Sequence, residues 1–261
     1  MAARGEDPAW LFWLSLVGLL ALIGGVIAAA PMIAKLAPAP PSPEVRVEKM
    51  LLEDGESGDV YRTVKRTFPE DFSQIVMVAA NALRQGTPEP MLAPVIRQAL
   101  AQAEARHRAQ LMQAPHDPLA AFRAAEIRLV QYFHEKDPEL CARYVATGRV
   151  TITDRTDLST DALDDMRIAA WEAYAAGRDK PAGRVIREPD MSVWRTIAKS
   201  MQSEGVSEAE VDALLSGRGF AMLPEMAQCQ TGIEFFRAIQ KLPPDRSDAV
   251  SAFLLSRNGT E

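Results

Sequence analysis

The most constraining feature of this sequence is the stretch from Pro8 to Ala34, which contains no charged side chain. A helix needs about 20 apolar residues to cross the ~30 Å hydrocarbon core of a bilayer, where the backbone must satisfy its own hydrogen bonds. The stretch is long enough, so we predict a short N-terminal tail at residues 1–8 and a transmembrane helix at residues 9–36. Trp10 and Trp13 at its start and Lys35 at its end are expected to lie in the two interfacial zones.

A cleaved signal peptide is the alternative interpretation of this segment. Residues 28–30 are all alanine and would suit a cleavage site. The tail is not basic overall, however, the apolar run exceeds the usual length of about 7–15 residues, and Pro31 follows the site directly. We therefore favour an uncleaved anchor.

The orientation of the anchor is less clear from the charges around it. Arg4 precedes the apolar run and Lys35, Arg46 and Lys49 follow it, which by the positive-inside rule favours a cytoplasmic C-terminal domain. A long domain can cross the membrane despite so few charges, and the two cysteines could pair in an oxidising compartment. We expect a single-pass protein of the bacterial inner-membrane type with its domain on the periplasmic side.

One face of the predicted anchor carries small residues at every fourth position: Ala21, Gly25 and Ala29. Small side chains let two membrane helices approach closely, so this stripe is a candidate helix-association face in a homo-oligomer. Spans rich in alanine and glycine also contain such stripes by chance.

A proline-rich segment follows the anchor at residues 37–44. Proline favours the extended polyproline II conformation, so we expect a stiff linker that holds the following domain some ~20 Å from the bilayer. A soluble domain is then predicted at residues 45–261.

Helix-forming residues dominate this domain, and the alternation of β-branched and polar residues expected of strands is almost absent. Val150–Thr153 is the one strand-like stretch and is too short to indicate a sheet. We predict an all-α domain of about nine helices. A stretch near residues 177–189, rich in Gly, Pro and charge, is a candidate boundary between two parts of the domain.

Local signals mark several of the predicted helix ends. Helix starts are expected at Pro69, Asp117-Pro118, Asp137-Pro138 and the Ser207–Glu210 capping box. One longer helix is expected to run from Met222 to Ile239.

Cys141 and Cys229 are too far apart in sequence to form a CxxC redox or zinc motif. If the domain is exported, we predict a disulfide between two helices that pack side by side, with Cα atoms about 4.4–6.8 Å apart. Two buried free thiols are the alternative.

The charge balance disfavours a nucleic-acid partner. The chain has 29 Lys and Arg against 35 Asp and Glu, a net charge of −6, so it offers no positive field for phosphates. A locally basic stretch contains Arg178, Lys180, Arg184 and Arg187. It could contact an anionic headgroup or polysaccharide, but solvated loop charges are the default interpretation.

No known catalytic, cofactor or metal motif is present. The histidines at 107, 116 and 134 have no ligand spacing, and the aspartates at 154–165 lack the calcium-loop pattern, so neither a metal nor a cofactor is expected. Four glutamates are of a kind that could act in glycoside hydrolysis, but the sequence cannot pair them in space: Glu53, Glu56, Glu104 and Glu126.

These observations favour a non-enzymatic role, that of a membrane-anchored envelope protein whose helical domain binds or scaffolds a protein partner or a second copy of itself. The partners expected are the lipid bilayer and an envelope protein. The alternative is a peptidoglycan hydrolase or binding enzyme that uses a carboxylate in a cleft between helices. Whether the chain is an enzyme stays open at this point.

Overall fold

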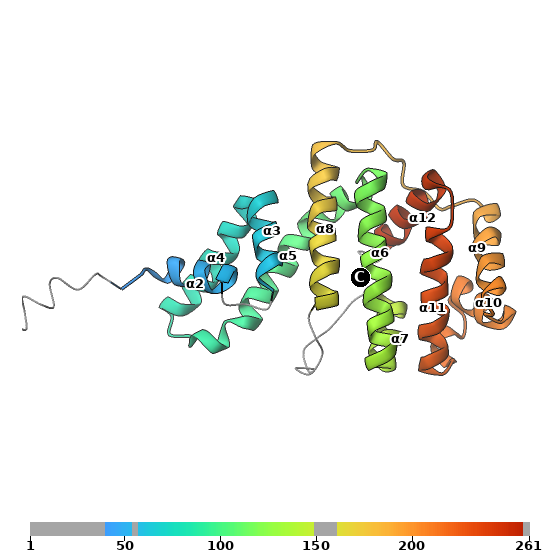
Figure 1. Cartoon of the computed structure of the whole chain (residues 1–261), viewed down its shortest axis with the longest axis horizontal. Coiled ribbons are helices and arrows are strands. Elements are labelled where there is room, and N and C mark those ends of the chain that lie inside the picture. Colours follow the sequence, from blue (N-terminus) through green and yellow to red (C-terminus); the bar gives the residue numbers. More distant parts are fainter. Residues whose placement is uncertain (1–39, 54–56, 149–160, 258–261) are drawn as a thin grey trace, which may run out of the picture. The chain divides into compact units, whose positions relative to one another are not determined.

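A computed structural model describes residues 40–53, 57–148 and 161–257 of the chain (Figure 1). The predicted tail and membrane helix lie outside these ranges, and with them Trp10, Trp13, Lys35 and the Ala21, Gly25 and Ala29 stripe. Among the described residues, no helix is both long and apolar enough to cross a membrane. Residues Pro43–Glu261 form one compact unit.

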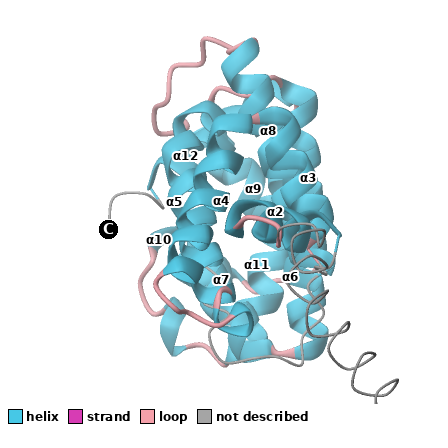
Figure 2. Ribbon diagram, turned by 90° about the vertical axis from the view of Figure 1, so that its left-hand side faces the viewer, coloured by secondary structure: helices cyan, strands magenta, loops and turns pink. Residues whose placement is uncertain are grey.

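The all-α prediction is confirmed for the part of the chain that the structure describes. It contains eleven α-helices and two short 3₁₀-helices joined by loops, without a strand (Figure 2). The α-helices are α2 (Pro43–Glu53), α3 (Gly58–Thr67), α4 (Pro69–Arg84), α5 (Ala93–Met112), α6 (His116–Lys136), α7 (Pro138–Thr147), α8 (Asp161–Asp179), α9 (Met191–Ser203), α10 (Glu208–Ser216), α11 (Glu225–Gln240) and α12 (Pro244–Arg257), and the 3₁₀-helices are η1 (Glu89–Met91) and η2 (Phe220–Met222).

The helix count exceeds the predicted nine partly because α2 begins within the proline-rich segment. Pro43 takes the first position of α2, where its missing N–H is not needed, and Glu44 lies in the first turn, where the helix dipole favours an acidic side chain. Val47 and Leu51 of α2 are buried against the rest of the unit.

Most of the helix starts lie where local signals placed them. Pro69 opens α4, and Asp137 caps α7 by accepting a hydrogen bond from the backbone N–H of Leu140 at 3.1 Å. Ser207 and Glu210 form both bonds of the predicted capping box.

Two predicted boundaries are wrong. Helix α6 begins at His116, so Asp117 and Pro118 lie inside its first turn, where a proline is tolerated because the first N–H groups have no partner within the helix. The helix predicted from Met222 is divided into η2 and α11. Pro224 accounts for this division, because a proline disfavours helical geometry in the residue before it.

The core of the unit consists of three clusters of buried side chains. The first lies among α2–α6 and α8, the second among α9–α12, and the third among α6, α7, α8 and α11. Met166 packs against the first and third clusters, and Phe236 packs against the second and third. Helices α8, α6, α11 and α9 stand next to one another in this order, so the third cluster lies between the other two (Figure 1).

Candidate functional site

A cavity of about 110 Å³ lies among α6, α7, α10, α11 and α12 and is partly open to solvent. Most of the side chains that line it are apolar. They are Phe122, Val145, Leu214, Phe235, Phe236, Ile239, Leu254 and Leu255. The polar groups at the wall come from Arg123, Glu126, Tyr144 and Ser251.

Among the residues that the structure describes, Glu126 is the only carboxylic acid in the wall of this cavity. Its Oε1 accepts a hydrogen bond from the hydroxyl of Tyr144 at 2.7 Å. Burial raises the pKa of the Glu126 carboxyl and outweighs the opposing effects of the Tyr144 hydrogen bond and the nearby Arg123. Glu126 therefore holds a proton more readily than a surface glutamate does.

The same buried surroundings also raise the pKa of Tyr144. Burial, and then the adjacent Glu126, raise the pKa of Tyr144 well above its usual value. The hydroxyl therefore stays a neutral hydrogen-bond donor at physiological pH, and it also lies 3.7 Å from the sulfur of Met166. The pair gives the apolar cavity one fixed polar edge.

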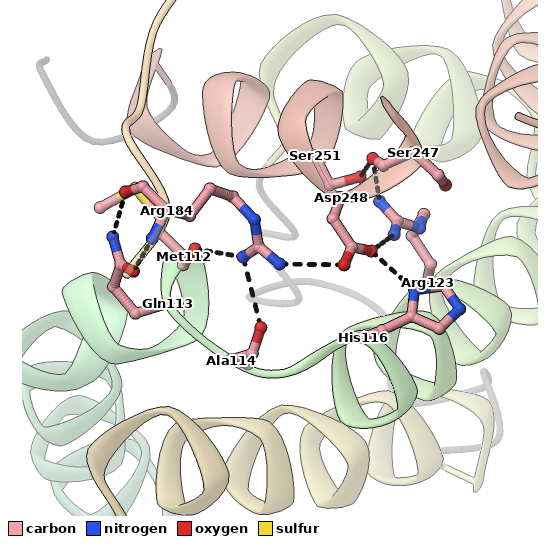
Figure 3. A network of polar contacts seen from close by, with 9 residues as sticks. All are labelled: Met112, Gln113, Ala114, His116, Arg123, Arg184, Ser247, Asp248 and Ser251. Atoms are coloured by element: carbon pink, nitrogen blue, oxygen red, sulfur yellow. Dashed lines mark hydrogen bonds and ion pairs between the residues drawn. The ribbon is translucent and has the colours of Figure 1, made fainter. Parts of the chain in front are cut away.

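Arg123 connects the cavity to a buried ionic network centred on Asp248 (Figure 3). Its guanidinium donates to the Ser247 carbonyl at 3.2 Å and to Asp248 Oδ1 at 3.4 Å. Arg184 donates to the other oxygen of Asp248 at 2.9 Å, and His116 Nδ1 lies 3.0 Å from Oδ1. One carboxylate is thus shared by two guanidinium groups and an imidazole.

Arg184 also forms hydrogen bonds that hold the loop after α8 against the end of α5 and the residues that connect it to α6 (Figure 3). Its guanidinium donates to the Met112 carbonyl at 2.7 Å, and its backbone N–H and C=O pair with the Gln113 side-chain amide at 2.8 Å each. Arg178 donates to the Thr67 carbonyl and lies 4.5 Å from the centre of the Phe68 ring. The default interpretation as a solvated loop charge is therefore wrong for Arg184, whereas Arg178 is exposed and lies in the last turn of α8.

Cys141 of α7 and Cys229 of α11 form the predicted disulfide, with their Cα atoms 5.4 Å apart. Both cysteines are fully buried. A bond that closes a loop of this length typically stabilises a fold by about 2–4 kcal/mol. Because α7 and α11 both line the cavity, the bond fixes two of its walls relative to each other.

The structure separates the four glutamates considered for hydrolysis. Glu53 is exposed, with its carboxyl 3.8 Å from the ammonium of Lys49, and Glu56 lies outside the described residues. Glu104 is 3.6 Å from Arg167, and burial raises the pKa of its carboxyl. Of the three glutamates that the structure describes, Glu126 alone lies in the cavity.

Two of the three histidines have carboxylate partners, whereas His134 Nδ1 is buried without a hydrogen-bond partner among the described residues. His107 Nε2 lies 2.7 Å from Asp71, and His116 faces Asp248. Within the described ranges, no three His, Cys, Asp or Glu side chains are grouped so that they could hold a metal ion.

Sequence reasoning included Glu126 among its candidates but missed Arg123, Tyr144 and Asp248. One signal was present, because Glu126 interrupts an apolar stripe on α6 that contains Phe122 and Val130 at helical spacing. Tyr144 follows Leu140 at helical spacing, a pattern typical of an apolar face, and nothing near Asp248 in sequence indicates its partners.

No protein-family model, no curated protein and no solved structure matches this chain. The proposals that follow therefore rest on the residues and geometry described above.

Proposed function

We propose that this protein is a membrane-anchored envelope protein whose helical domain binds a small, mostly apolar molecule in the cavity among α6, α7, α10, α11 and α12. The observation that carries this proposal is the composition of the wall, in which eight apolar side chains surround one polar edge formed by Glu126 and Tyr144. Ligand sites in proteins commonly have this form, with apolar walls that supply affinity and a few polar groups that set orientation.

The size of the cavity limits the part of the ligand that it can hold. In another protein, an apolar cavity of about 150 Å³ binds benzene. The cavity here is somewhat smaller, at about 110 Å³, and opens to solvent on one side. It suits a short alkyl or aryl group, and a larger molecule would extend out of the opening.

Photolabelling can test this proposal with the full chain in lipid nanodiscs. A short alkyl diazirine alcohol should label residues of α6, α7, α11 and α12, and hexanol should compete with it. Leu214→Trp places an indole at the cavity wall and should abolish this labelling. Leu215→Trp is the matched control on the same helix, because Leu215 is 36% exposed and does not line the cavity. Labelling that hexanol does not reduce, or that survives Leu214→Trp, would contradict the proposal.

The membrane anchor is the second part of the proposal and is supported by the uncharged stretch at residues 8–34. The Cys141–Cys229 bond supports a periplasmic location of the domain, because stable structural disulfides are rare in a reducing cytosol. Full-length protein should remain in the membrane fraction after a carbonate wash, and a chain without residues 1–36 should not.

A protein partner is the third part, either an envelope protein or a second copy of this chain through the Ala21, Gly25 and Ala29 stripe. Purification in mild detergent should recover a dimer or a reproducible partner. If the chain is a dimer, Gly25→Leu should dissociate it, whereas Leu20→Ile in the same helix should not.

A peptidoglycan hydrolase is the second candidate, and the raised pKa of Glu126 favours it because a general acid must hold its proton near neutral pH. Against it, glycoside hydrolysis normally needs two carboxyl groups about 5–9.5 Å apart, and Glu126 is the only one that lines the cavity among the described residues. Purified peptidoglycan incubated with the protein distinguishes the candidates. Cleavage by the wild type that is lost in Glu126→Gln would establish the enzyme, and intact peptidoglycan would reject it.

A further inference from the structure

We infer that the ligand of this cavity is an acid, a short alkyl or aryl carboxylate whose anionic head lies against Arg123 and Glu126 and whose apolar body lies among the phenylalanine and leucine side chains. This inference rests on the proposed function and adds the chemical class of the ligand.

The charges around the cavity favour an anion at Arg123. The Arg123 side chain is only 4% exposed, and burial of a cation without a matching anion is costly. Asp248 lies 2.9 Å from Arg184 but 3.4 Å from Arg123, so it neutralises Arg184 more directly. The buried guanidinium of Arg123 and the half-buried one of Arg184 share this one carboxylate, and Arg123 is the one that faces the cavity.

An ionised Glu126 would supply a second negative charge for Arg123, but Glu126 accepts its hydrogen bond from Tyr144 and not from Arg123. Burial raises the pKa of its carboxyl, which favours the neutral form. A neutral Glu126 offers a hydroxyl that can donate to a ligand oxygen. A ligand carboxylate would thus meet one charged donor, Arg123, and one neutral donor, Glu126.

The remaining polar groups near Arg123 and Glu126 do not change the preference for an anionic ligand. On α7, Tyr144 is a neutral donor, and on α12 the Ser251 hydroxyl already donates to the Ser247 carbonyl at 2.8 Å. His116 contacts the same oxygen of Asp248 as Arg123 does, but it does not line the cavity (Figure 3). A ligand amine would place a second positive charge beside Arg123, and a ligand alcohol would not neutralise the charge of Arg123.

The apolar wall limits the body of this acid. Phe122, Phe235 and Phe236 together with three leucines line the cavity, and its volume of about 110 Å³ is below that of a known benzene site. We therefore expect an apolar body on the order of five or six non-hydrogen atoms, as in the phenyl ring of benzoate or the pentyl chain of hexanoate.

Three short alkyl diazirines of the same length test the inference, one with a carboxylate, one with a hydroxyl and one with an amine. Each is photolysed at equal concentration with the full chain in phosphatidylcholine nanodiscs, whose headgroups carry no net charge. Labelled residues are then mapped by mass spectrometry. We expect the carboxylate to label cavity residues about tenfold more than the alcohol, because a charge-assisted hydrogen bond is stronger than a neutral one. The amine should label them least.

The possible results separate this inference from the function on which it rests. Equal labelling by the alcohol and the carboxylate would overturn the acid and leave the cavity as an apolar site. Stronger labelling by the amine would also overturn it and would indicate an ionised Glu126. If none of the three probes labels the cavity, the proposed function fails as well.

Two variants provide a further check on the role of each polar group. Arg123→Met keeps the length of the side chain and removes its charge, so the preference for the carboxylate should be lost while labelling by the alcohol remains. Glu126→Gln keeps a neutral donor and should retain the preference. If Arg123→Met does not fold, the comparison of the three probes in the wild type and in Glu126→Gln still decides the question. A preference that disappears in Glu126→Gln would contradict the assigned roles.

Discussion

Asp248 is a single residue that joins distant parts of the chain, because its carboxylate contacts His116 and Arg123 of α6 and Arg184 of the loop after α8. Asp248→Asn would leave the buried guanidinium of Arg123 and the half-buried one of Arg184 without a counter-charge. We expect a loss of about 3–5 kcal/mol in the free energy of unfolding, measured by urea denaturation. Asp245→Asn, at an exposed position of the same helix, should cost less than about 1 kcal/mol. Equal denaturation midpoints for the two variants would contradict this assignment.

Asp71 should make stability depend on pH. Burial alone would raise the pKa of its carboxyl, but hydrogen bonds from Arg106 at 2.5 Å and His107 at 2.7 Å outweigh burial and lower it. The pKa in the unfolded chain is about 3.9, so the folded value lies below it. The stabilisation is then present above that pH and is lost as the pH falls through the folded pKa.

The variant Asp71→Asn isolates this contribution. The difference in unfolding free energy between wild type and variant should be larger at about pH 7 than at about pH 3. Urea titrations at the two pH values measure it, and a difference that does not change with pH would show that Asp71 keeps its unfolded pKa.

At the scale of elements, the contact between α8 and α5 depends on a position without a side chain. A Cβ atom at Gly177 would lie 1.9 Å from the carbonyl oxygen of Gln110 and 2.8 Å from its carbon. These are backbone atoms of a neighbouring helix and cannot rotate away. Gly177→Ala should therefore destabilise the fold by about 1–3 kcal/mol or more, although alanine favours helix by about 1 kcal/mol.

A thermal or urea melt of Gly177→Ala measures this loss, and Gly58→Ala is its control. At Gly58 the nearest atom to an added Cβ is the end of the flexible Arg62 side chain, at 3.0 Å, which can move aside. Gly58→Ala should melt close to the wild type. A Gly177→Ala variant as stable as Gly58→Ala would mean that α8 and α5 can separate at little cost.

At the scale of the whole molecule, the three core clusters should unfold together. Met166 and Phe236 each pack against two clusters, and the Cys141–Cys229 and Asp248 links connect helices distant in sequence. Trp171 lies in the first cluster and Trp194 packs against the second, so each can report on one part by fluorescence. With Trp10 and Trp13 changed to Phe, variants that retain only Trp171 or only Trp194 should each show the same urea midpoint by fluorescence as by circular dichroism of the same variant.

A fluorescence midpoint that differs from the circular dichroism midpoint of the same variant would show that the clusters unfold separately. Circular dichroism is the internal reference, because either Trp→Phe change can shift stability by itself.

Much of the local structure could be predicted from sequence because its causes lie within a turn or two. Asp137 caps α7 by accepting from the N–H of Leu140. The side chains of Ser207 and Glu210 each accept a hydrogen bond from the backbone N–H of the other residue. In both cases three or four residues contain the whole signal. The wrong start of α6 arose because the Asp117-Pro118 pair fits a first turn as well as a cap. The cysteine pairing was predictable because the chain contains only two cysteines.

The sequence by itself thus determined the all-α class, most of the helix starts and the one partner that each cysteine could have within the chain, Cys141 with Cys229. Only the tertiary structure decided the site. Arg184 and Asp248 are 64 positions apart, and His116 and Asp248 are 132 apart, so no local pattern could join them. The cavity exists because side chains from five separate helices leave space unfilled, which depends on how the helices pack and not on any one of them.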